Sequence, residues 1–475
     1  MQTKGITEFL IDHAGKDPVS FHMPGHKGSD IYKRYGHDRF LENFIDCDIT
    51  EIPGADNLFQ TEGIIKATAE KYRELYDVRK SYLLINGTSG GLIASVLATV
   101  PAGKRLVMAR NCHKSVFNAL TLGGIEPVYA YPSMIEEYGI SGPVTCEEIE
   151  RCLRENPDAE AVLLPSPNYY GICSDIAAIA ETVHAHGKVL IVDQAHGAHL
   201  KFMAGEPKAA EECGADIVVN STHKTLASFT QSAVLNLNSD RVEQYVLEDK
   251  LQAIQSTSPS YLLMASLDIN ADILMEHGDE LMDSWDENIR DFYDKAAEIP
   301  GLKLMDVPGH MDKTKINLDM SSCGIDGNEL EELLMDEEIY AELVTGNILM
   351  CMTGIGNTAD DYERLLKVLK ALAERKESDL CAGGEKRADS GGAALWNKRR
   401  ALHEIPKKKK QVPLDAGEGM ICASSIIPYP PGIPFLCPGE EIGREEIEYI
   451  KLLRGRGEKV IGVDENMCVV VGDTV

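Results

Sequence analysis

The 475-residue chain lacks the features that mark secreted, membrane-spanning and nucleic-acid-binding proteins. Its twelve cysteines are scattered without a CxxC pair, a pattern that in so long a chain indicates reduced thiols in a cytoplasm. No signal-peptide core opens the sequence and no run of about 18 apolar residues occurs, so we expect no membrane span. Positive charge is scarce, since 47 Lys and Arg face 76 Asp and Glu. The net charge of −29 argues against nucleic acid or an anionic membrane as the main partner.

Apolar residues are plentiful, at 44% of the chain, and can build a sizeable core. A chain of this length exceeds what one core usually serves, so two or three folded domains are expected. We predict an N-terminal arm and loop over 1–59, a large domain over 60–298 that ends in a long connecting helix, a smaller domain over 299–376, a polar, Gly-rich linker over 377–394, and a C-terminal domain over 395–475.

Short apolar runs alternate with helical patterns in the predicted large domain. The runs AVLLP (161–165), VLIV (189–192) and DIVVN (216–220) are typical of strands that are buried on both faces. Between the first two, Ser174 is expected as the N-cap of a helix that ends at Gly187. This alternation predicts an α/β fold with a mainly parallel sheet and helices on both faces.

Reactive side chains follow four predicted strands: VLIV, DIVVN and two further apolar runs, YLLI (82–85) and RLVMA (105–109). They lie at the sheet edge where ligands bind in parallel α/β folds. They are Asp193 after VLIV, Lys224 after DIVVN, His113 after RLVMA, and the turn NGTSGG (86–91) after YLLI. A small-residue turn at a helix start can bind phosphate through free N–H groups. A lysine can hold an aldehyde cofactor as an imine, and a buried carboxylate can keep a pyridine nitrogen protonated. Each residue alone could be a helix cap, a solvated lysine or an ordinary turn, but the set indicates a pyridoxal 5′-phosphate (PLP) site.

Six motifs resemble, in this order, those of the Orn/Lys/Arg decarboxylases: HMPGHKG, NGTSGG, RNCHKS, DQAHGAH, STHK and PYPPGIPFLCPGE. The pair DQAHGAH and STHK is specific for PLP enzymes of fold type I, and HMPGHKG with PYPPGIP narrows the resemblance to this family. The resemblance runs from about residue 5 to beyond 440 and is to the short form of the family, without an N-terminal wing domain. It implies the aspartate-aminotransferase-like fold with a smaller C-terminal α+β domain, and at least a homodimer.

The same resemblance implies roles for individual residues. Lys224 would hold PLP as a Schiff base and Asp193 would pair with the pyridine nitrogen. Ala195 would pack on one ring face and His113 on the other. His196 stands where many relatives have Trp, beside the 3′-oxygen of the cofactor. The further cofactor-binding residues that it implies are Gly87, Thr88, Ser89, Ser221 and His223, together with Ser256 from the neighbouring subunit.

For the substrate, the resemblance implies a basic amino acid, with Glu440 of CPGE facing its distal cation. We favour L-arginine, giving agmatine and CO₂, because the short form resembles arginine decarboxylases most and a guanidinium pairs bidentately with a carboxylate. Lysine and ornithine are alternatives. An aminotransferase or lyase of fold type I, or a catalytically silent regulatory homologue, are alternatives of another class. The sequence does not choose between Lys224 and His113 as the acid that protonates Cα.

A dinucleotide-like motif, GxGxxA at 354–359, also follows an apolar run. Thr358 as N-cap with Asp361 three residues later explains it as the start of a helix. The pairs His22 and His26, and His184 and His186, have no carboxylate or cysteine at ligand spacing, so no metal site is expected.

Overall fold

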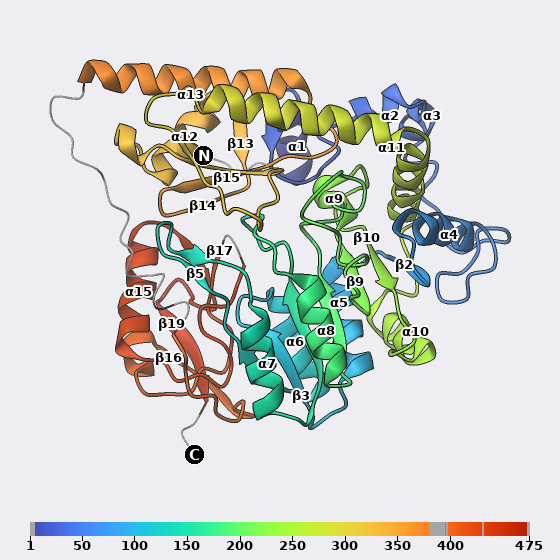
Figure 1. The fold of residues 1–475 in the computed structure, drawn as a ribbon, viewed down its shortest axis with the longest axis vertical. Coiled ribbons are helices and arrows are strands. Elements are labelled where there is room, and N and C mark those ends of the chain that lie inside the picture. Colours follow the sequence, from blue (N-terminus) through green and yellow to red (C-terminus); the bar gives the residue numbers. More distant parts are fainter. Residues whose placement is uncertain (1–4, 380–394, 396–397, 430–431, 473–475) are drawn as a thin grey trace.

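A computed structural model describes residues 5–379, 395, 398–429 and 432–472 (Figure 1). Its centre is a seven-stranded sheet in which β10 runs antiparallel to both of its neighbours and the other pairs are parallel. The prediction of a mainly parallel sheet is confirmed. In spatial order the strands are β2 (Lys80–Leu84), β10 (Ala233–Leu237), β9 (Ile217–Asn220), β8 (Val189–Asp193), β7 (Ala159–Pro165), β3 (Arg105–Ala109) and β4 (Glu126–Ala130).

Helices cover both faces of this sheet. The chain moves one way across the sheet from β2 to β4 and the other way from β4 to β8, so right-handed crossovers put the connecting helices on opposite faces. Helices α5 and α6 pack against each other, as do α7 and α8. The bounds are α5 (Gly87–Thr99), α6 (Lys114–Gly123), α7 (Cys146–Glu155), α8 (Ile176–Ala185) and α10 (Gln244–Ile254), with the hairpin strands β5 (Met134–Ile135) and β6 (Ile140–Ser141) before α7.

The start of α8 differs from the prediction by one residue. Asp175 is the N-cap, and its carboxylate accepts the N–H of Ala178 at 3.0 Å. The hydroxyl of Ser174 instead accepts the N–H of Val144 at 3.0 Å, so a tertiary contact takes the side chain expected to cap. The predicted helix end is confirmed, because Gly187 follows α8 with φ of +70°, where a side chain would be strained.

The small domain is built on the predicted connecting helix, which is α11 (Tyr261–Ala296). Figure 1 shows α11 and α13 lying across the top of a four-stranded sheet with the order β11-β12-β15-β14. The N-terminal arm joins this domain because β1 pairs parallel with β13. The bounds are β11 (Lys303–Leu304), β12 (Lys315–Asp319), β13 (Ile339–Ala341), β14 (Leu343–Thr345), β15 (Ile348–Met352), α12 (Gly327–Asp336) and α13 (Ala359–Asp379), and in the arm α1 (Ile6–Ala14), β1 (Val19–Phe21), α2 (Asp30–Arg34) and α3 (Asp38–Glu42). After the arm, α4 (Ile64–Tyr76) leads into β2 of the large domain.

The glycines of the dinucleotide-like motif serve packing. A Cβ on Gly356 would lie 2.1 Å from the carbonyl oxygen of His26, and one on Gly354 would lie 2.6 Å from that of Gly25. Asp361 accepts the N–H of Thr358 at 2.9 Å, as expected for a helix start. The motif therefore lets the small domain approach the HMPGHKG loop closely.

The C-terminal domain packs beside α7 and β5 (Figure 1) around its own apolar core. Its elements are β16 (Lys409–Pro413) paired with β19 (Cys468–Gly472), β17 (Ile427–Tyr429) paired with β18 (Lys459–Ile461), and α15 (Arg444–Gly455). Most of the predicted linker, residues 380–394, lies outside the described residues, as do two prolines of PYPPGIP at 430–431. Within the described chain no helix is long and apolar enough to cross a bilayer.

Candidate active site

A cavity of about 590 Å³ lies where the carboxyl ends of β2, β3, β7, β8 and β9 meet. Residues of the small domain and of the HMPGHKG loop also line it. Ten of the twelve predicted site residues contribute to its wall, although they come from four separate parts of the sequence. These ten are Gly87, Thr88, Ser89, His113, Asp193, Ala195, His196, Ser221, His223 and Lys224.

One end of the cavity suits a phosphate. Gly87 begins the 13-residue helix α5 with φ of +65°, a conformation that favours glycine. Thr88 and Ser89 follow in the first turn, whose backbone N–H groups have no partner within the helix. Ser221, at the end of β9, donates its hydroxyl proton to Thr88 at 3.2 Å and so joins a second strand end to this turn. Nearby, His223 donates from Nδ1 to the Ser232 carbonyl, and burial lowers its pKa to about 4.

Lys224 lies in the short helix α9 (Thr222–Thr225), directly after the β9 strand end. Its Nζ is 2.9 Å from Nε2 of His196 and 5.7 Å from the ring centre of Tyr169. Burial lowers the pKa of Lys224, and the carboxylates of Glu342 and Asp193 oppose that shift. A lysine with a lowered pKa is more often a neutral amine, which is the form that attacks an aldehyde.

Two other lysines are buried nearby, but neither lines the cavity. The Nζ of Lys315 donates to Asp312 at 2.7 Å, to Thr314 at 3.1 Å and to the His196 carbonyl, which uses its three protons. Burial lowers the pKa of Lys27 to about 7, yet its Nζ donates to two backbone carbonyls. Among the described residues that line the cavity, Lys224 is the only lysine.

Asp193 ends β8 and is 5% exposed. Its Oδ1 accepts the N–H of Ala195 at 3.2 Å. Burial raises the pKa of this carboxyl, and the charge of Lys224 and the Ala195 hydrogen bond oppose the shift. A buried carboxylate gains most from a cation placed against it, so a protonated pyridine nitrogen fits this position.

Two polar atoms of the cavity wall are buried without a hydrogen-bond partner in the described part of the chain. They are Nδ1 of His196 and Oδ1 of Asn111. Such atoms are rare in folded proteins and point to a bound polar ligand. Together with the helix start suited to phosphate, the amine of Lys224 and the buried carboxylate of Asp193, they fit PLP. No group of three or more metal-ligating side chains occurs among the described residues.

His113 caps the start of α6, where its Nδ1 accepts the N–H of Ser115 at 3.3 Å. Burial, with a contribution from the charge of Lys224, lowers the pKa of His113 to about 3. The imidazole is therefore neutral at pH 7, and because Nδ1 accepts, its proton lies on Nε2.

We expect the His113 imidazole of the apoprotein not to titrate between pH 8 and pH 5. The measurement is histidine NMR over that range, with the His113 signal assigned by its loss in His113→Gln. The signal should keep its neutral position and move only as the pH approaches about 3. A midpoint near the ordinary value of about 6.5 would contradict this environment.

Glu440 lies outside this cavity, which corrects its expected role. It is fully buried, and its two oxygens accept from Nε and Nη2 of Arg110 at 3.2 and 2.9 Å and from the Cys437 N–H at 2.9 Å. The carboxylate is thus neutralised within the chain rather than open to a substrate cation. Ser256 is exposed and its hydroxyl bonds within its own turn to Ser258, so a contact with a second subunit stays a prediction.

The sequence analysis missed Glu342, which lies between β13 and β14 and lines the cavity. Its Oε2 accepts the N–H of Met23 at 3.0 Å. Apart from Asp193 it is the one acidic residue among the described residues of the wall. No local pattern marks it, because tertiary packing of the small domain brings it to the sheet. By contrast, Asn168 and Tyr169 follow β7, and they also line the cavity. The expectation that residues just after a parallel strand lie at the site would have found them.

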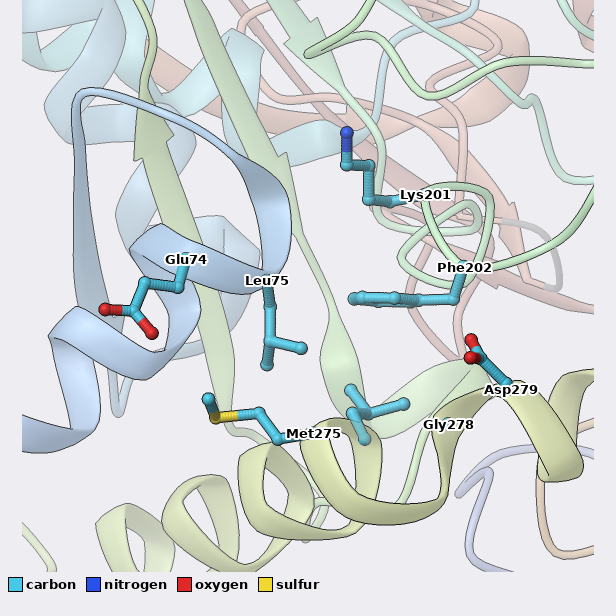
Figure 2. Close-up of a pocket in the computed structure, with 8 residues that line it drawn as sticks. Glu74, Leu75, Lys201, Phe202, Met275, Gly278 and Asp279 are labelled. Atoms are coloured by element: carbon cyan, nitrogen blue, oxygen red, sulfur yellow. The ribbon is translucent and has the colours of Figure 1, made fainter.

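A second hollow, of about 380 Å³, lies between α4 and α11 (Figure 2). Its Lys201 is paired with Glu212 at 3.3 Å, and Figure 2 shows this side chain pointing away from α11. None of the twelve predicted site residues lies in its wall. The wall consists of Glu74, Leu75, Lys201, Phe202, Leu274, Met275, Gly278 and Asp279.

Comparison with known proteins agrees with this geometry. The sequence model of the Orn/Lys/Arg decarboxylase major domain matches residues 5–307, and that of the C-terminal domain matches residues 393–470. The chain is 32% identical to an arginine decarboxylase of Bacillus subtilis over 460 residues, 93% of this chain and 91% of that protein. It is 30% identical to an arginine decarboxylase of Halalkalibacterium halodurans over 472 residues, 96% and 94% of the two chains. The solved lysine decarboxylase LdcF of Francisella novicida shares the fold with a TM-score of 0.75 at 20% identity, covering 98% of this chain and 84% of that one.

Proposed function

The chain belongs to the Orn/Lys/Arg decarboxylase family, and we propose that within this family of PLP-dependent decarboxylases it converts L-arginine to agmatine and CO₂. One observation carries the proposal: the wall of a single cavity contains an amine, a buried carboxylate, a helix start suited to phosphate, and a second carboxylate. The relatives named arginine decarboxylase, at 30% identity or more over nearly the whole chain, support the choice of arginine.

PLP, when bound, supplies an electron sink for the pair released from the bond between Cα and the carboxylate. In our proposal, Lys224 would hold its aldehyde and Asp193 would keep its ring nitrogen protonated. Ala195 and His113 would pack against the ring, and His196, whose Nε2 is 2.9 Å from Nζ of Lys224, would lie beside the imine. The start of α5 and the end of β9 would hold the phosphate, through Gly87, Thr88, Ser89, Ser221 and His223.

We propose Lys224 as the acid that returns a proton to Cα. Its Nζ lies in the cavity wall, 2.9 Å from Nε2 of His196. The pKa of His113, lowered by burial to about 3, leaves that imidazole neutral and a poor acid at pH 7. The Nε2–H of His113 can still orient a substrate oxygen. His22 and Met23 of the HMPGHKG loop and residues 341–343 of the small domain line the cavity. A closer approach of these residues around a bound substrate would exclude water from the departing carboxylate.

Glu342 is our candidate for the group that binds the distal cation of the substrate. Desolvating a guanidinium requires an opposing carboxylate, and Asp193 is committed to the ring nitrogen in this proposal. The planar guanidinium can pair with both oxygens of Glu342, which an ammonium cannot do with the same geometry.

Comparing arginine, lysine and ornithine in wild type and in Glu342→Gln tests both parts of this proposal. We expect kcat/KM to be highest for arginine. In the variant we expect kcat/KM for the basic substrates to fall about 10- to 100-fold, the loss typical of a hydrogen bond to a charged group. Norleucine, which lacks the distal cation, is the control and should lose far less.

The outcomes separate the two assignments. Lysine or ornithine leading in wild type would overturn the substrate. An unchanged kcat/KM in Glu342→Gln would overturn the role of Glu342 and leave the decarboxylase assignment standing. Absence of CO₂ release from all three substrates would overturn the function itself.

We further propose a homodimer that completes each site. Helix α1 has no buried residue, and four of its apolar side chains, Ile6, Phe9, Leu10 and Ile11, are between 57% and 81% exposed. A cluster of this kind on a folded protein marks a surface for association. Sedimentation of wild type should give about twice the 52.1 kDa of one chain, and Phe9→Glu should weaken the dimer. A fully active wild-type monomer would contradict the proposal.

A further inference from the structure

Arg110 connects the cavity wall to the C-terminal domain. It directly follows β3, next to Asn111 and three residues before His113, both of which line the cavity. Its guanidinium, 2% exposed, extends into the C-terminal domain. There Nη1 donates to the Pro434 carbonyl at 2.7 Å and Nη2 to the Phe435 carbonyl at 3.0 Å.

Glu440 completes this contact with a bidentate ion pair to Arg110. Its oxygens accept from Nε and Nη2 of Arg110 at 3.2 and 2.9 Å, and the Cys437 N–H holds the same carboxylate in place. The rings of Phe117 and Tyr129, on α6 and β4, lie 5.9 and 5.3 Å from the guanidinium carbon. The large domain and the C-terminal domain thus enclose one charge pair between them.

Such a pair is weak evidence for stability, because desolvating two charges costs about as much as their attraction returns. It is, however, strongly directional, since four N–H donors of one guanidinium meet fixed acceptors. The backbone of Arg110 is fixed as well, because its N–H donates to the Ala130 carbonyl at 2.8 Å. Residue 110 is therefore anchored at both its backbone and its side-chain end.

We propose that Arg110 and Glu440 are positioning residues: through them the C-terminal domain fixes the turn at 110–113, so that Asn111 and His113 face the cavity at a set distance from Lys224. The CPGE motif then influences the site through the contact of Glu440 with Arg110 and does not touch substrate. This inference rests on the proposed function only for the role of His113 beside the cofactor ring.

The C-terminal domain offers a matched control. Arg400 and Glu446 form another buried pair, 3.0 Å apart, with side chains 4% and 1% exposed. Arg400 also lies over the Phe435 ring at 5.4 Å. Because both partners belong to the C-terminal domain, breaking this pair disturbs the domain without removing a hydrogen bond or ion pair of Arg110 itself.

Hydrogen exchange of the full-length apoprotein, followed by mass spectrometry, tests the inference without activity. In Glu440→Gln and in Arg110→Lys we expect the amides of 111–116 to exchange about tenfold faster than in wild type. In Arg400→Lys and Glu446→Gln these amides should keep the wild-type rate, while exchange within 398–472 rises. Arg110→Lys retains the positive charge but loses the planar guanidinium that binds the carboxylate bidentately. It therefore tests the inference if Glu440→Gln fails to fold.

With PLP bound, the same variants should show a kinetic split. We expect kcat for arginine to fall about tenfold or more in Glu440→Gln, since small displacements of site groups are costly, with a much smaller change in KM. The visible circular dichroism of bound PLP should change in this variant and not in the controls. Wild-type exchange at 111–116 in both Glu440→Gln and Arg110→Lys, or equal acceleration in the controls, would overturn the inference. Faster exchange there in a protein that decarboxylates no basic amino acid would retain the positioning and refute the proposed function.

Discussion

Lys224→Ala is expected to abolish the covalent capture of PLP and to lower kcat/KM for arginine on the order of 10⁴-fold. The reason for both effects is the position of Lys224 in the cavity wall. Lys224 is the only lysine among the described residues of the cavity wall, and its Nζ meets His196 there, whereas the protons of Lys315 are taken by three acceptors. No other lysine of the described chain lines this cavity, so none is placed to take over the imine.

The measurement is the visible absorbance of the purified variant with added PLP, together with its rate of CO₂ release. Lys224→Arg is the control, because it keeps a positive charge at this position but forms no imine. Both variants should lose the imine absorbance. An imine in Lys224→Ala that borohydride still traps, or turnover near the wild-type rate, would contradict the assignment.

Asp193→Asn is expected to keep PLP bound and to lower kcat about 10²- to 5 × 10³-fold, the scale set by breaking a buried charge pair at about 3–5 kcal/mol. An amide cannot hold the ring nitrogen in its protonated form, so the bound cofactor becomes a poorer electron sink. PLP should remain bound because the start of α5, which is suited to its phosphate, and Lys224 are unchanged in this variant.

Glu211→Gln is the matched control for this experiment. Glu211 is another buried acid beside the same sheet, and its oxygens accept from Gln194, Asn220 and Asn236. It does not line the cavity, so its substitution should lower thermal stability while kcat stays within a few-fold of wild type. A kcat near wild type in Asp193→Asn would remove that residue from the proposed chemistry.

The parts of the site that sequence could predict are those fixed by local geometry. A residue that follows a buried parallel strand must lie at the carboxyl edge of the sheet, so Asp193, Lys224 and His113 could be placed together before any coordinates were known. The left-handed Gly187 and the long helix α11 follow from equally local patterns.

The parts that could not be predicted depend on how separate domains meet. Glu342 has an unremarkable strand context and becomes a wall residue only because the small domain packs over the sheet. Glu440 stands in a motif that suggested substrate, but the fold puts Arg110 against it. The cap of α8 differs from the prediction for a similar reason. The hydroxyl of Ser174 accepts the N–H of Val144, 30 residues earlier in the chain, and Asp175 caps the helix instead.

Borohydride reduction of the wild-type enzyme with PLP, followed by peptide mass mapping, tests the central claim most directly. We expect one pyridoxyl group per chain, attached to Lys224. The Lys224→Ala variant treated in parallel should carry no pyridoxyl group and should release almost no CO₂ from arginine. A pyridoxyl group on Lys27 or Lys315, or no modification of an enzyme that releases CO₂ from arginine, would contradict the central claim.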